Sequence, residues 1–484
     1  MRKMKENACN NKNQKKNPGF LLSAVSSNSG KTAAACGLMS AFKQEGERVC
    51  ACKCGPDYID PMFHREVLGV DSKNLDLFFS EEDILKEGYL KHTKDADITI
   101  TEGVMGFYDG MSLDSVKGSS YDVAQTLGLP VILVINARGA AMTLVATVKG
   151  IAEFRPDSNI RGILLNRVSA MLYPRLKEML GNELARIGHD EIKIVGYMPE
   201  NEAFHLESRH LGLVTPQEME NLQEKVRQAG EILAKTVDLE LLEKIAGEAA
   251  VWKTEVIEES EKVGNLKSKN DPVRIAVARD EAFCFYYKDN LELLESLGCE
   301  VIEFSPLHDK KLPENVKGIL LGGGYPELYG KELAENQGML ESIRRALDDK
   351  IPCLAECGGF MYLHQTMEDT EHHVYEMAGV VPGDCFYTGK LVRFGYIELT
   401  EKESNFLPEN GSIKGHEFHY FDSTANGDDC VALKPVSGKK YDCVFDKNSC
   451  FVGFPHLYYP SAPQFAENFV KKAKNYADRS EVNS

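Results

Sequence analysis

The chain has 484 residues, which exceeds the size of one ordinary hydrophobic core, so we expect two domains of about 200 residues each. A hydrophobic share of 43% and a charged share of 27% are typical of a globular protein, and no apolar run reaches the roughly 18 residues that a membrane helix needs. The net charge of −18 argues against a nucleic-acid-binding protein, because neutralising phosphates requires clustered Lys and Arg.

The amino-terminal segment and the cysteines indicate a cytoplasmic protein. Residues 1–18 are basic and polar and lack the apolar stretch of a secretory signal, so we expect a tail there. Thirteen cysteines, an odd number without framework spacing, fit a reducing compartment. Three of them alternate at positions 50, 52 and 54, where the period of a strand would place them on one face. We interpret them as a packing stripe, because zinc ligands usually arrive as separated CxxC pairs.

The first half of the chain alternates between apolar runs and helix-like stretches. A buried strand is predicted at 19–25 and a helix at 32–43. Further apolar runs follow at ERVCACK, ADITITEG, PVILVINA, IRGILLNRV and IKIVGYMP. Short apolar runs that alternate with helical segments predict βαβ units and a parallel sheet.

The second half repeats this alternation after a segment of mixed charge. That segment, at 241–272, is the best linker candidate, and apolar runs resume with VRIAVARD, CEVIEF, KGILLGGG and IPCLAECGG. The sequence therefore predicts two α/β domains. The predicted organisation is a polar tail (1–18), a first domain (19–240), the linker (241–272), a second domain (273–472) and a polar tail (473–484).

A candidate phosphate loop, AVSSNSGKT, follows the first strand. Gly30, Lys31 and Thr32 open a helix, where free backbone N–H groups and the helix dipole favour an anion. The lysine supplies positive charge to the terminal phosphates, and the threonine hydroxyl is a ligand for Mg²⁺. A strict GxxxxGK[ST] motif would place glycine where this chain has Val25. An ordinary strand-to-helix turn is the alternative interpretation.

Polar residues gather where the predicted strands of the first domain end. The stretch GPDYIDP (55–61) follows the second apolar run, Glu102 ends the third, and Asn166 ends another. Ligands of open parallel sheets bind beyond the carboxyl ends of the strands, so these residues are expected near the phosphate loop. Glu102 is placed to hold Mg²⁺ directly or through water, and an N-capping carboxylate is the alternative. The two prolines limit φ, which gives the carboxylates between them fixed directions.

The second domain contains a candidate nucleophile. Cys357 follows an apolar strand and precedes two glycines and a helix, the strand–nucleophile–helix arrangement that exposes a side chain at a tight turn. Gly358 and the cluster at 322–324 leave backbone N–H groups for an oxyanion hole. The base is either His456 or one of the pair His416 and His419. A buried structural cysteine is the alternative reading of this stretch.

Taken together, the two sites indicate a glutamine amidotransferase. One domain would activate a carboxylate with ATP, and the other would release ammonia from glutamine through a thiol. Two rivals come from other classes. A non-catalytic nucleotide-dependent switch would leave the cysteine turn without a role, and a thiol hydrolase that does not use ATP would leave the GKT loop without one.

Several longer motifs carry a family resemblance. From about Pro18 to about Phe469 the chain resembles the cobyrinate a,c-diamide synthases of cobalamin biosynthesis. The matching stretches are SSNSGKT, KCGPDYIDPMFH, EGVMGFYDG, LGLPVILVINARG, ILLNRV, ESRHLGLV, GGGYPELYG, AECGGFMYL and GHEFHY. The resemblance implies a phosphate-loop domain similar to dethiobiotin synthetase and a class I glutaminase domain. It also implies ATP-dependent amidation of the a and c acetate side chains of a corrin.

The resemblance assigns roles to particular residues. Those implied for phosphate and nucleotide are Ser29, Gly30, Lys31, Thr32 and Asn166, the last facing the base. Those implied for metal are Thr32, Glu102 and Asp57. Those implied for the substrate and its amidation are Asp57, Tyr58, Asp60 and Asp109. Those implied for the glutaminase are Cys357 as nucleophile, His456 as base, and Gly323, Gly324 and Gly358 as the oxyanion hole.

The resemblance also implies partners and leaves alternatives open. Mg²⁺ and ATP are expected, with glutamine and a tetrapyrrole carboxylate as substrates; a homodimer is compatible with the sequence. Cobyrinic acid is the first substrate candidate, with nickel-sirohydrochlorin and hydrogenobyrinate as alternatives. After His456 stands Leu457-Tyr458, where the family usually has a second histidine and other class I glutaminases a glutamate. A Cys–His dyad is therefore the expectation, with His419 as the alternative base.

Overall fold

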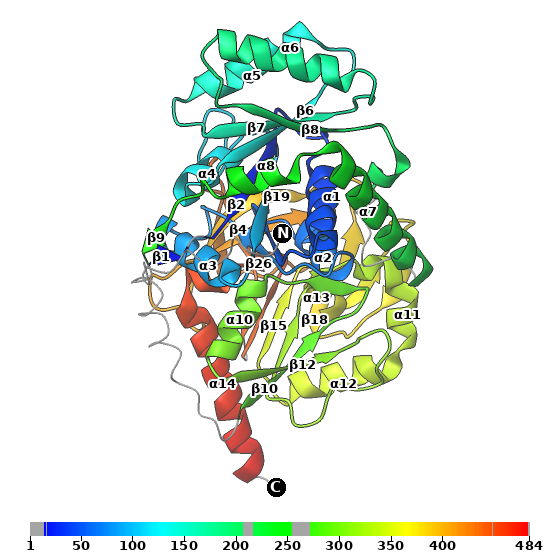
Figure 1. Cartoon of the computed structure of the whole chain (residues 1–484). Helices are drawn as coiled ribbons and strands as arrows, with labels where there is room; N and C mark the ends of the chain where they lie inside the picture. Colours follow the sequence, from blue (N-terminus) through cyan, green and yellow to red (C-terminus); the bar gives the residue numbers. More distant parts are fainter. Residues whose placement is uncertain (1–13, 16, 207–215, 254–271, 448, 483–484) are drawn as a thin grey trace. The chain divides into compact units, whose positions relative to one another are not determined.

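The chain folds into two compact units, each built around its own sheet (Figure 1). The computed structural model describes residues 14–15, 17–206, 216–253, 272–447 and 449–482. Unit 1 comprises Met1–Arg209 and Val214–Lys262, and unit 2 comprises His210–Leu213 and Val263–Ser484. Within the described ranges, no helix is long and apolar enough to cross a membrane.

Unit 1 contains a sheet of seven parallel strands. They are β2 (Gly19–Ala24), β3 (Val49–Cys54), β4 (Ser72–Leu75), β5 (Ile98–Glu102), β6 (Val131–Asn136), β7 (Ile160–Asn166) and β8 (Lys193–Met198). Their order across the sheet is β4-β3-β5-β2-β6-β7-β8. Central strands such as β2, in which all six residues are buried, are apolar because helices cover both faces of a parallel sheet. The predicted parallel α/β fold is confirmed.

Helices cover both faces of this sheet. They are α1 (Lys31–Gln44), α2 (Ile59–Glu66), α3 (Glu82–Thr93), α4 (Ser120–Leu127), α5 (Met142–Phe154), α6 (Tyr173–Arg186), η1 (Glu202–Phe204), α7 (Pro216–Thr236) and α8 (Leu239–Ala246). Val123 of α4, Val148 of α5 and Leu180 of α6 share one buried cluster with Leu133 of β6. Figure 1 shows α5 and α6 on one side of β6, β7 and β8, and α7 and α8 on the other.

The ends of unit 1 differ from the predicted boundaries. Helix α8 lies within the range assigned to the linker, and it buries Leu242, Ile245 and Ala246 at helical spacing. Residues 241–246 therefore belong to unit 1. In the predicted amino-terminal tail, β1 (Gln14–Lys15) pairs antiparallel with β9 (Trp252–Lys253). Residues 254–271 of the predicted linker and residues 1–13 lie outside the described residues.

The alternating cysteines lie in β3 and are buried. Cys52 and Cys54 are fully buried and belong to the same apolar cluster as Leu21 and Leu75, while Cys50 is 6% exposed. All three are free thiols. Their side chains therefore fill the space between β3 and the helices on that face of the sheet.

Unit 2 contains a six-stranded sheet. Its strands are β10 (Val273–Ala278), β12 (Cys299–Phe304), β13 (Gly318–Leu321), β15 (Cys353–Glu356), β24 (Phe445–Lys447) and β25 (Cys450–Gly453). The order is β12-β10-β13-β15-β25-β24, and only the edge strand β24 runs antiparallel to its neighbour. The predicted α/β fold of the second half is thus confirmed.

Alternate residues of these strands face two separate cores. In β10, Ala276 and Ala278 pack in one cluster, whereas Ile275 and Val277 pack in the other. The helices of the unit are α10 (Lys288–Ser296), η3 (Pro326–Tyr329), α11 (Gly330–Glu335), α12 (Gln337–Asp348), α13 (Gly358–Leu363), η4 (Tyr459–Ser461) and α14 (Pro463–Val482). Helix α14 continues through most of the range predicted as a polar tail from 473.

Three smaller sheets complete the described part of unit 2. A five-stranded antiparallel sheet consists of β23 (Lys440–Cys443), β22 (Cys430–Leu433), β19 (Arg393–Glu401), β20 (Ile413–His419) and β26 (His456–Leu457). A four-stranded sheet consists of β17 (Val374–Glu376), β16 (His364–Glu368), β18 (Val381–Tyr387) and β21 (Phe421–Ser423). A two-stranded sheet pairs β11 (Phe283–Phe285) with β14 (Gly323–Gly324). Pairing of β26 with β20 carries His456 to a fixed place in the unit.

Candidate active sites

The predicted phosphate loop connects β2 to α1, and its shape depends on a contact from β7. Gly30 has φ of 95°, and a Cβ at this position would collide with the side-chain amide of Asn166. That amide donates a hydrogen bond of 2.9 Å to the carbonyl of Ser29. Glycine is therefore required at this position for conformation and for space. The nucleotide-base contact expected for Asn166 stays a prediction, because here its amide supports the loop.

Lys31 lies along the loop and is buried. Its Nζ donates to the carbonyl of Met105 at 2.5 Å and to that of Ser26 at 3.3 Å. Burial and the neighbouring ammonium of Lys53 lower the pKa of Lys31 to about 8, although the carboxylate of Glu102 opposes this shift. The cation is thus held by neutral carbonyls, from which an incoming phosphate could attract it.

A buried ion-pair network connects the loop to the next two strands of the sheet. The Thr32 hydroxyl donates to Glu102 Oε1 at 2.6 Å, and Lys53 Nζ lies 3.0 Å from the same oxygen. Lys53 and Glu102 are register partners in the parallel pair β3–β5, so their side chains share one face of the sheet. Glu102 is fully buried and ends β5, which rules out the alternative role of an N-capping carboxylate.

Two further groups from α2 complete this network. Asp60 Oδ2 lies 2.5 Å from Lys53 Nζ, so one ammonium is shared by two buried carboxylates. His64 is fully buried, with Nε2 3.4 Å from Glu102 Oε2 and Nδ1 3.0 Å from the Ser72 hydroxyl. The network therefore holds more carboxylates than lysines at its centre.

The charges of the network are set by burial and by Lys53. Burial disfavours ionisation of Glu102, but Lys53, His64 and the Thr32 hydroxyl outweigh it and hold the pKa of Glu102 well below its usual range. Burial and the charge of Glu102 raise the pKa of Asp60 even though Lys53 lies beside it. Burial likewise opposes the charge of Lys53, yet Asp60 and Glu102 raise its pKa. Lys53 therefore stays a cation that fixes both carboxylates in place.

The GPDYIDP turn is held by hydrogen bonds from within and from β4. Asp57 Oδ1 accepts from the backbone N–H groups of Ile59 at 2.8 Å and Asp60 at 3.2 Å, so this carboxylate caps the start of α2. The Asn74 amide donates to the carbonyls of Gly55 at 2.9 Å and Asp57 at 2.6 Å. The rigidity predicted from the prolines thus has a second source in Asn74.

The other predicted substrate residues lie at the edge of this site. Tyr58 is half-buried, between Asp57 and the first residue of α2. Asp109 is exposed, and its Oδ2 accepts from the Gly106 N–H at 3.0 Å. The same carboxylate contributes to the electrostatic surroundings of Lys31, which places it on the phosphate-loop side of the sheet.

The donor set at the loop fits Mg²⁺. Mg²⁺ in nucleotide sites is usually held by one or two protein oxygens together with phosphate and water. The Thr32 hydroxyl and the Glu102 carboxylate, 2.6 Å apart beside the loop, supply such oxygens. Among the described residues no three His, Cys, Asp or Glu side chains group as a metal site. For Asp57, capping is the role seen, and metal binding stays a prediction.

The predicted nucleophile in unit 2 lies in a strained turn. Cys357 joins β15 to α13 with φ of 48° and ψ of −105°, a conformation that residues with a Cβ rarely adopt. Backbone hydrogen bonds of 2.9 Å connect its N–H to the Gly453 carbonyl and its carbonyl to the Met361 N–H. The elbow geometry is present, but the residue is only 8% exposed, whereas the sequence predicted an exposed side chain.

His456 is the histidine that the structure brings to Cys357. Burial lowers the pKa of His456, but the charge of Cys357, a hydrogen bond to its sulfur and a nearby carboxylate raise it to about 10. The alternative His419 instead stacks on Phe454 at 4.2 Å between ring centroids, and its Nδ1 lies 2.7 Å from the Phe421 carbonyl. His416 packs against two aromatic rings, and burial and His456 lower its pKa to about 3.

The glycines around the turn make room for this arrangement. A Cβ on Gly323 would collide with the His456 ring, so glycine is needed for the ring to reach its position. A Cβ on Gly358 would lie 2.9 Å from Pro326 and 3.2 Å from the Gly324 nitrogen. Gly324 and Gly358 are therefore neighbours, as an oxyanion hole would require. Their role as donors stays a prediction.

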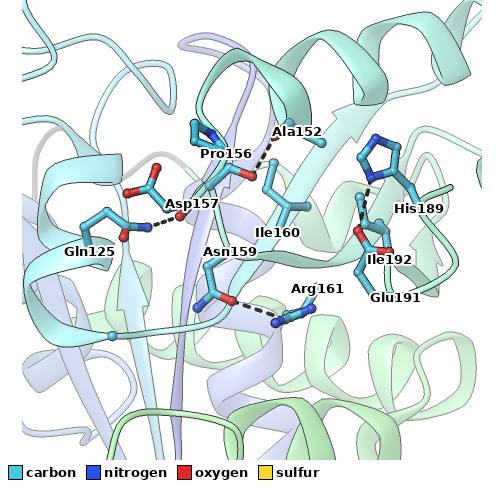
Figure 2. A pocket seen from close by; sticks show the side chains of 12 residues that line it. Gln125, Ala152, Pro156, Asp157, Asn159, Ile160, Arg161, His189, Glu191 and Ile192 are labelled. Carbon is cyan, nitrogen blue, oxygen red and sulfur yellow. Dashed lines mark hydrogen bonds and ion pairs between the residues drawn. The ribbon is translucent and has the colours of Figure 1, made fainter.

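A pocket of about 360 Å³ lies elsewhere in unit 1, among segments that precede β6, β7 and β8 (Figure 2). Asn159 Oδ1 accepts from Arg161 Nε at 3.2 Å, and the Ser158 hydroxyl donates to the Ala152 carbonyl at 3.0 Å. This is the amino-terminal edge of the strands, opposite to the phosphate loop. Ligands of open parallel sheets bind at the carboxyl edge, so we assign this pocket no part in the reaction.

Lys53, His64 and Asn74 were not among the residues singled out from the sequence. Lys53 and His64 lie in the matching stretch KCGPDYIDPMFH, but a lysine within an apolar strand gave no sign of its partners. The adjacency of β3 and β5, which places Lys53 beside Glu102, appears only in the sheet. The motif ESRHLGLV falls at 207–214, outside the described residues.

Two domain families match the chain and define its class. The CobQ/CobB/MinD/ParA nucleotide binding domain matches residues 21–214, within unit 1 for the most part. The CobB/CobQ-like glutamine amidotransferase domain matches residues 274–461 in unit 2. The protein is therefore an enzyme, a ligase that forms C–N bonds with glutamine as the amido donor and has a nucleotide-binding domain.

Similar chains narrow the class to one family. The cobyrinate a,c-diamide synthase of Caldanaerobacter subterraneus is 37% identical over 461 residues, which cover 94% of this chain and 98% of that protein. The synthases of Priestia megaterium (37%, covering 95% and 97%) and Fusobacterium nucleatum (39%, covering 93% and 99%) are similar to the same degree. The chain belongs to the cobyrinate a,c-diamide synthase family, which confirms the resemblance drawn from its motifs.

Proposed function

We propose that this protein catalyses the ATP- and glutamine-dependent amidation of the a and c acetate carboxylates of cobyrinic acid, through acyl phosphates. The observation that carries the proposal is the similarity along nearly the whole chain to proteins named cobyrinate a,c-diamide synthase. Two chemically different sites support it. Unit 1 has a phosphate loop beside buried carboxylates, and unit 2 has a cysteine turn with a histidine.

In the glutaminase half, Cys357 attacks the carboxamide carbon of glutamine. A C–S bond forms and the C–N bond breaks, while protonated His456 gives its proton to the departing ammonia. The N–H groups of Gly324 and Gly358 stabilise the oxyanion. Water, deprotonated by His456, then attacks the thioester to release glutamate and the thiol.

In the synthetase half, an acetate carboxylate oxygen attacks the γ-phosphorus of ATP, and ADP leaves. Lys31 and the loop N–H groups hold the phosphates in line and neutralise their charge. Thr32 and Glu102 would hold Mg²⁺, which supplies further positive charge to the phosphates. Ammonia then attacks the acyl carbon and phosphate departs, so two amidations consume two ATP and two glutamine molecules.

The turn that contains Asp57, Tyr58 and Asp60 would orient the carboxylate that is activated. This role is supported by the rigidity of the turn, which is fixed by the Asp57 cap and by Asn74. Because phosphoryl transfer depends mainly on positioning, a rigid support is more useful here than a mobile loop. Asp109 would act at the edge of the same site, and the cytoplasm, where ATP and glutamine are plentiful, would be the location.

Nickel-sirohydrochlorin and hydrogenobyrinate are the alternative substrates, since both carry acetate side chains that the same residues could amidate. The test offers purified protein each of cobyrinic acid, hydrogenobyrinate, sirohydrochlorin and nickel-sirohydrochlorin, with glutamine and MgATP. Replacing a hydroxyl by an amino group lowers the mass by about 1 Da, so a diamide is read directly by mass spectrometry. We expect two amidations of cobyrinic acid. Diamidation of a different tetrapyrrole alone would overturn this choice of substrate.

A further inference from the structure

A buried carboxylate lies beside the candidate base His456. Glu356 is the last residue of β15, directly before Cys357, and it is 8% exposed. Its Oε2 lies 3.8 Å from Nδ1 of His456, which is 3% exposed. A carboxylate at this distance from an imidazole in a buried site is an ion-pair partner whenever the ring is protonated.

The Glu356 carboxylate is itself held in place. The Tyr459 hydroxyl donates to Glu356 Oε1 at 3.1 Å, and Tyr459 is 1% exposed. Asn290 of α10 accepts from the Tyr459 N–H at 2.8 Å and donates to the Leu457 carbonyl at 2.8 Å. The chain on both sides of Tyr458 is thus fixed to α10, and Tyr459 points one carboxylate oxygen away from His456 while the other faces it.

The strained turn explains how two consecutive residues reach one imidazole. Successive side chains of a strand point to opposite faces. The positive φ of Cys357 breaks this alternation, so Glu356 at the strand end and Cys357 in the turn both interact with His456. The sequence Glu-Cys-Gly-Gly therefore places a carboxylate and a thiol beside the same imidazole.

We propose that Glu356 is a positioning residue that orients His456 and stabilises its protonated form during glutamine hydrolysis. Other class I glutaminases have a glutamate shortly after the histidine, where this chain has Leu457-Tyr458. Glu356 would supply the equivalent carboxylate from the strand that precedes the nucleophile. The inference rests on the proposed glutaminase role of Cys357 and His456. It follows the general logic of a nucleophile, a base and a third group that orients the base.

The other groups around His456 do not replace Glu356. Burial and His456 lower the pKa of His416, its register partner across β20 and β26, and an imidazole supplies no negative charge in either protonation state. Gly323 packs against the ring and Phe285 lies 6.5 Å away between ring centroids. Among the described residues, charged and titratable groups near His456 include Cys357, Glu356 and His416, and Tyr459 donates to the carboxylate of Glu356.

The test measures thiolate formation at Cys357 without glutamine, ATP or a tetrapyrrole. Full-length protein is alkylated with iodoacetamide between pH 5 and 10, and modification of Cys357 is followed by mass spectrometry of fragment ions, which separate it from the other cysteines. In Glu356→Gln we expect the midpoint to rise by about one pH unit, equivalent to about a tenfold slower reaction at neutral pH. The kcat for glutamine hydrolysis should fall at least as much, with KM within about twofold.

Two variants separate orientation from folding. Glu303→Gln, at an exposed ion pair with Arg279 in the same unit, should leave the alkylation curve unchanged. Glu356→Asp keeps the charge and should recover part of the wild-type rate, whereas Tyr459→Phe should shift the curve in the same direction by less. Curves of Glu356→Gln and Tyr459→Phe that superimpose on wild type, in protein with an unchanged melting temperature, would overturn the proposal.

Failure of the proposed function gives a different result. If wild type alkylates readily at Cys357 but hydrolyses no glutamine, the glutaminase role is wrong. The alkylation curves would still show whether Glu356 stabilises the ion pair. If Glu356→Gln does not fold, the Tyr459→Phe curve decides. A Tyr459→Phe curve that superimposes on that of the wild type then contradicts the inference.

Discussion

The two candidate sites differ in how many charged groups they bury. The site of unit 1 is crowded with ionised groups, where Lys53 is shared by Asp60 and Glu102 within 3.0 Å. The site of unit 2 has one thiol in a strained turn and a histidine that fits only because Gly323 has no side chain. The first site depends on mutual neutralisation of several fixed charges, and the second on the steric placement of a reactive pair beside one buried carboxylate, Glu356.

This difference follows from the chemistry that each site has to perform. Phosphoryl transfer requires the protein to position the reactants and to neutralise charge, and it requires no nucleophile from the protein. Thiol attack on an amide requires a protein nucleophile that forms a covalent bond and a proton donor for the leaving ammonia. Substitutions in the charge network of unit 1 should therefore act through charge balance and stability, whereas substitutions of Cys357 and Gly323 in unit 2 should act on the reactive pair with the fold intact.

The largest effect is expected from Cys357→Ala. It removes the nucleophile, so glutamine-dependent amidation should fall by at least about a thousandfold, as for other covalent catalysts. Amidation with ammonium chloride should continue, because unit 1 is unchanged. Both activities are measured by mass spectrometry of the tetrapyrrole product, and Cys450→Ala is the control on a partly buried free thiol. Loss of both activities in Cys357→Ala would contradict the assignment of glutamine hydrolysis to unit 2 and of amidation to unit 1.

The next effect concerns the charge network of unit 1. Lys53→Met removes the ammonium and leaves Asp60 and Glu102 buried without it, so we expect the free energy of unfolding to fall by about 3–5 kcal/mol. Chemical denaturation measures this change. Lys149→Met removes a partly exposed lysine paired with Glu153 and should cost less than about 1 kcal/mol.

Asp60→Asn separates charge balance from activity within the same network. It leaves Lys53 paired with Glu102 alone, so stability should change much less than in Lys53→Met. Amidation with ammonium should still fall, because the carboxylate proposed to orient the substrate is lost. Equal loss of stability in both variants would show that the network needs three charges, and unchanged amidation would remove Asp60 from the mechanism.

A smaller effect is expected from Gly323→Ala. The added methyl group collides with the His456 ring, which has to turn away from Cys357. We expect glutamine hydrolysis to slow by about 10- to 100-fold, in line with a misplaced general acid–base group. The melting temperature should change little if the ring can move. Gly323 has no positive φ, so the control is Gly150→Ala, which adds a methyl group in open space at another glycine without positive φ. Full activity in Gly323→Ala would contradict the steric account of unit 2.

The smallest effect is a pH dependence of nucleotide binding. The pKa of Lys31 is lowered to about 8, so the side chain is a cation below this pH and becomes neutral as the pH rises through it. Affinity for ATP should therefore fall several-fold between pH 7 and 9, as measured by fluorescence titration. Lys31→Arg should flatten this dependence, because a guanidinium does not titrate in that range. If the affinity of the wild type for ATP does not change between pH 7 and 9, Lys31 is not the phosphate ligand.

Sequence patterns predicted those features that depend on neighbouring residues. The alternation of apolar runs predicted both α/β units, and glycines beside Cys357 predicted its turn. The sequence placed Glu102 and Asn166 near the loop and His456 with Cys357, but it missed the partners of Lys53 and of Glu356, because sheet order creates those pairs. Lys53 meets Glu102 through the adjacency of β3 and β5, and Glu356 meets His456 across 100 residues of chain. Helix α8 was read as linker because its charged residues concealed three buried positions at helical spacing.

The conformation of Cys357 has a consequence for how the protein tolerates change. A residue with φ of 48° and ψ of −105° lies where glycine is favoured, and holding a cysteine there costs about 1–3 kcal/mol. Replacing it with glycine would relieve this cost in the folded protein while removing the thiol. A screen for heat-resistant variants would therefore enrich inactive enzymes changed at this position, so thermostability alone is a misleading guide to improving this protein.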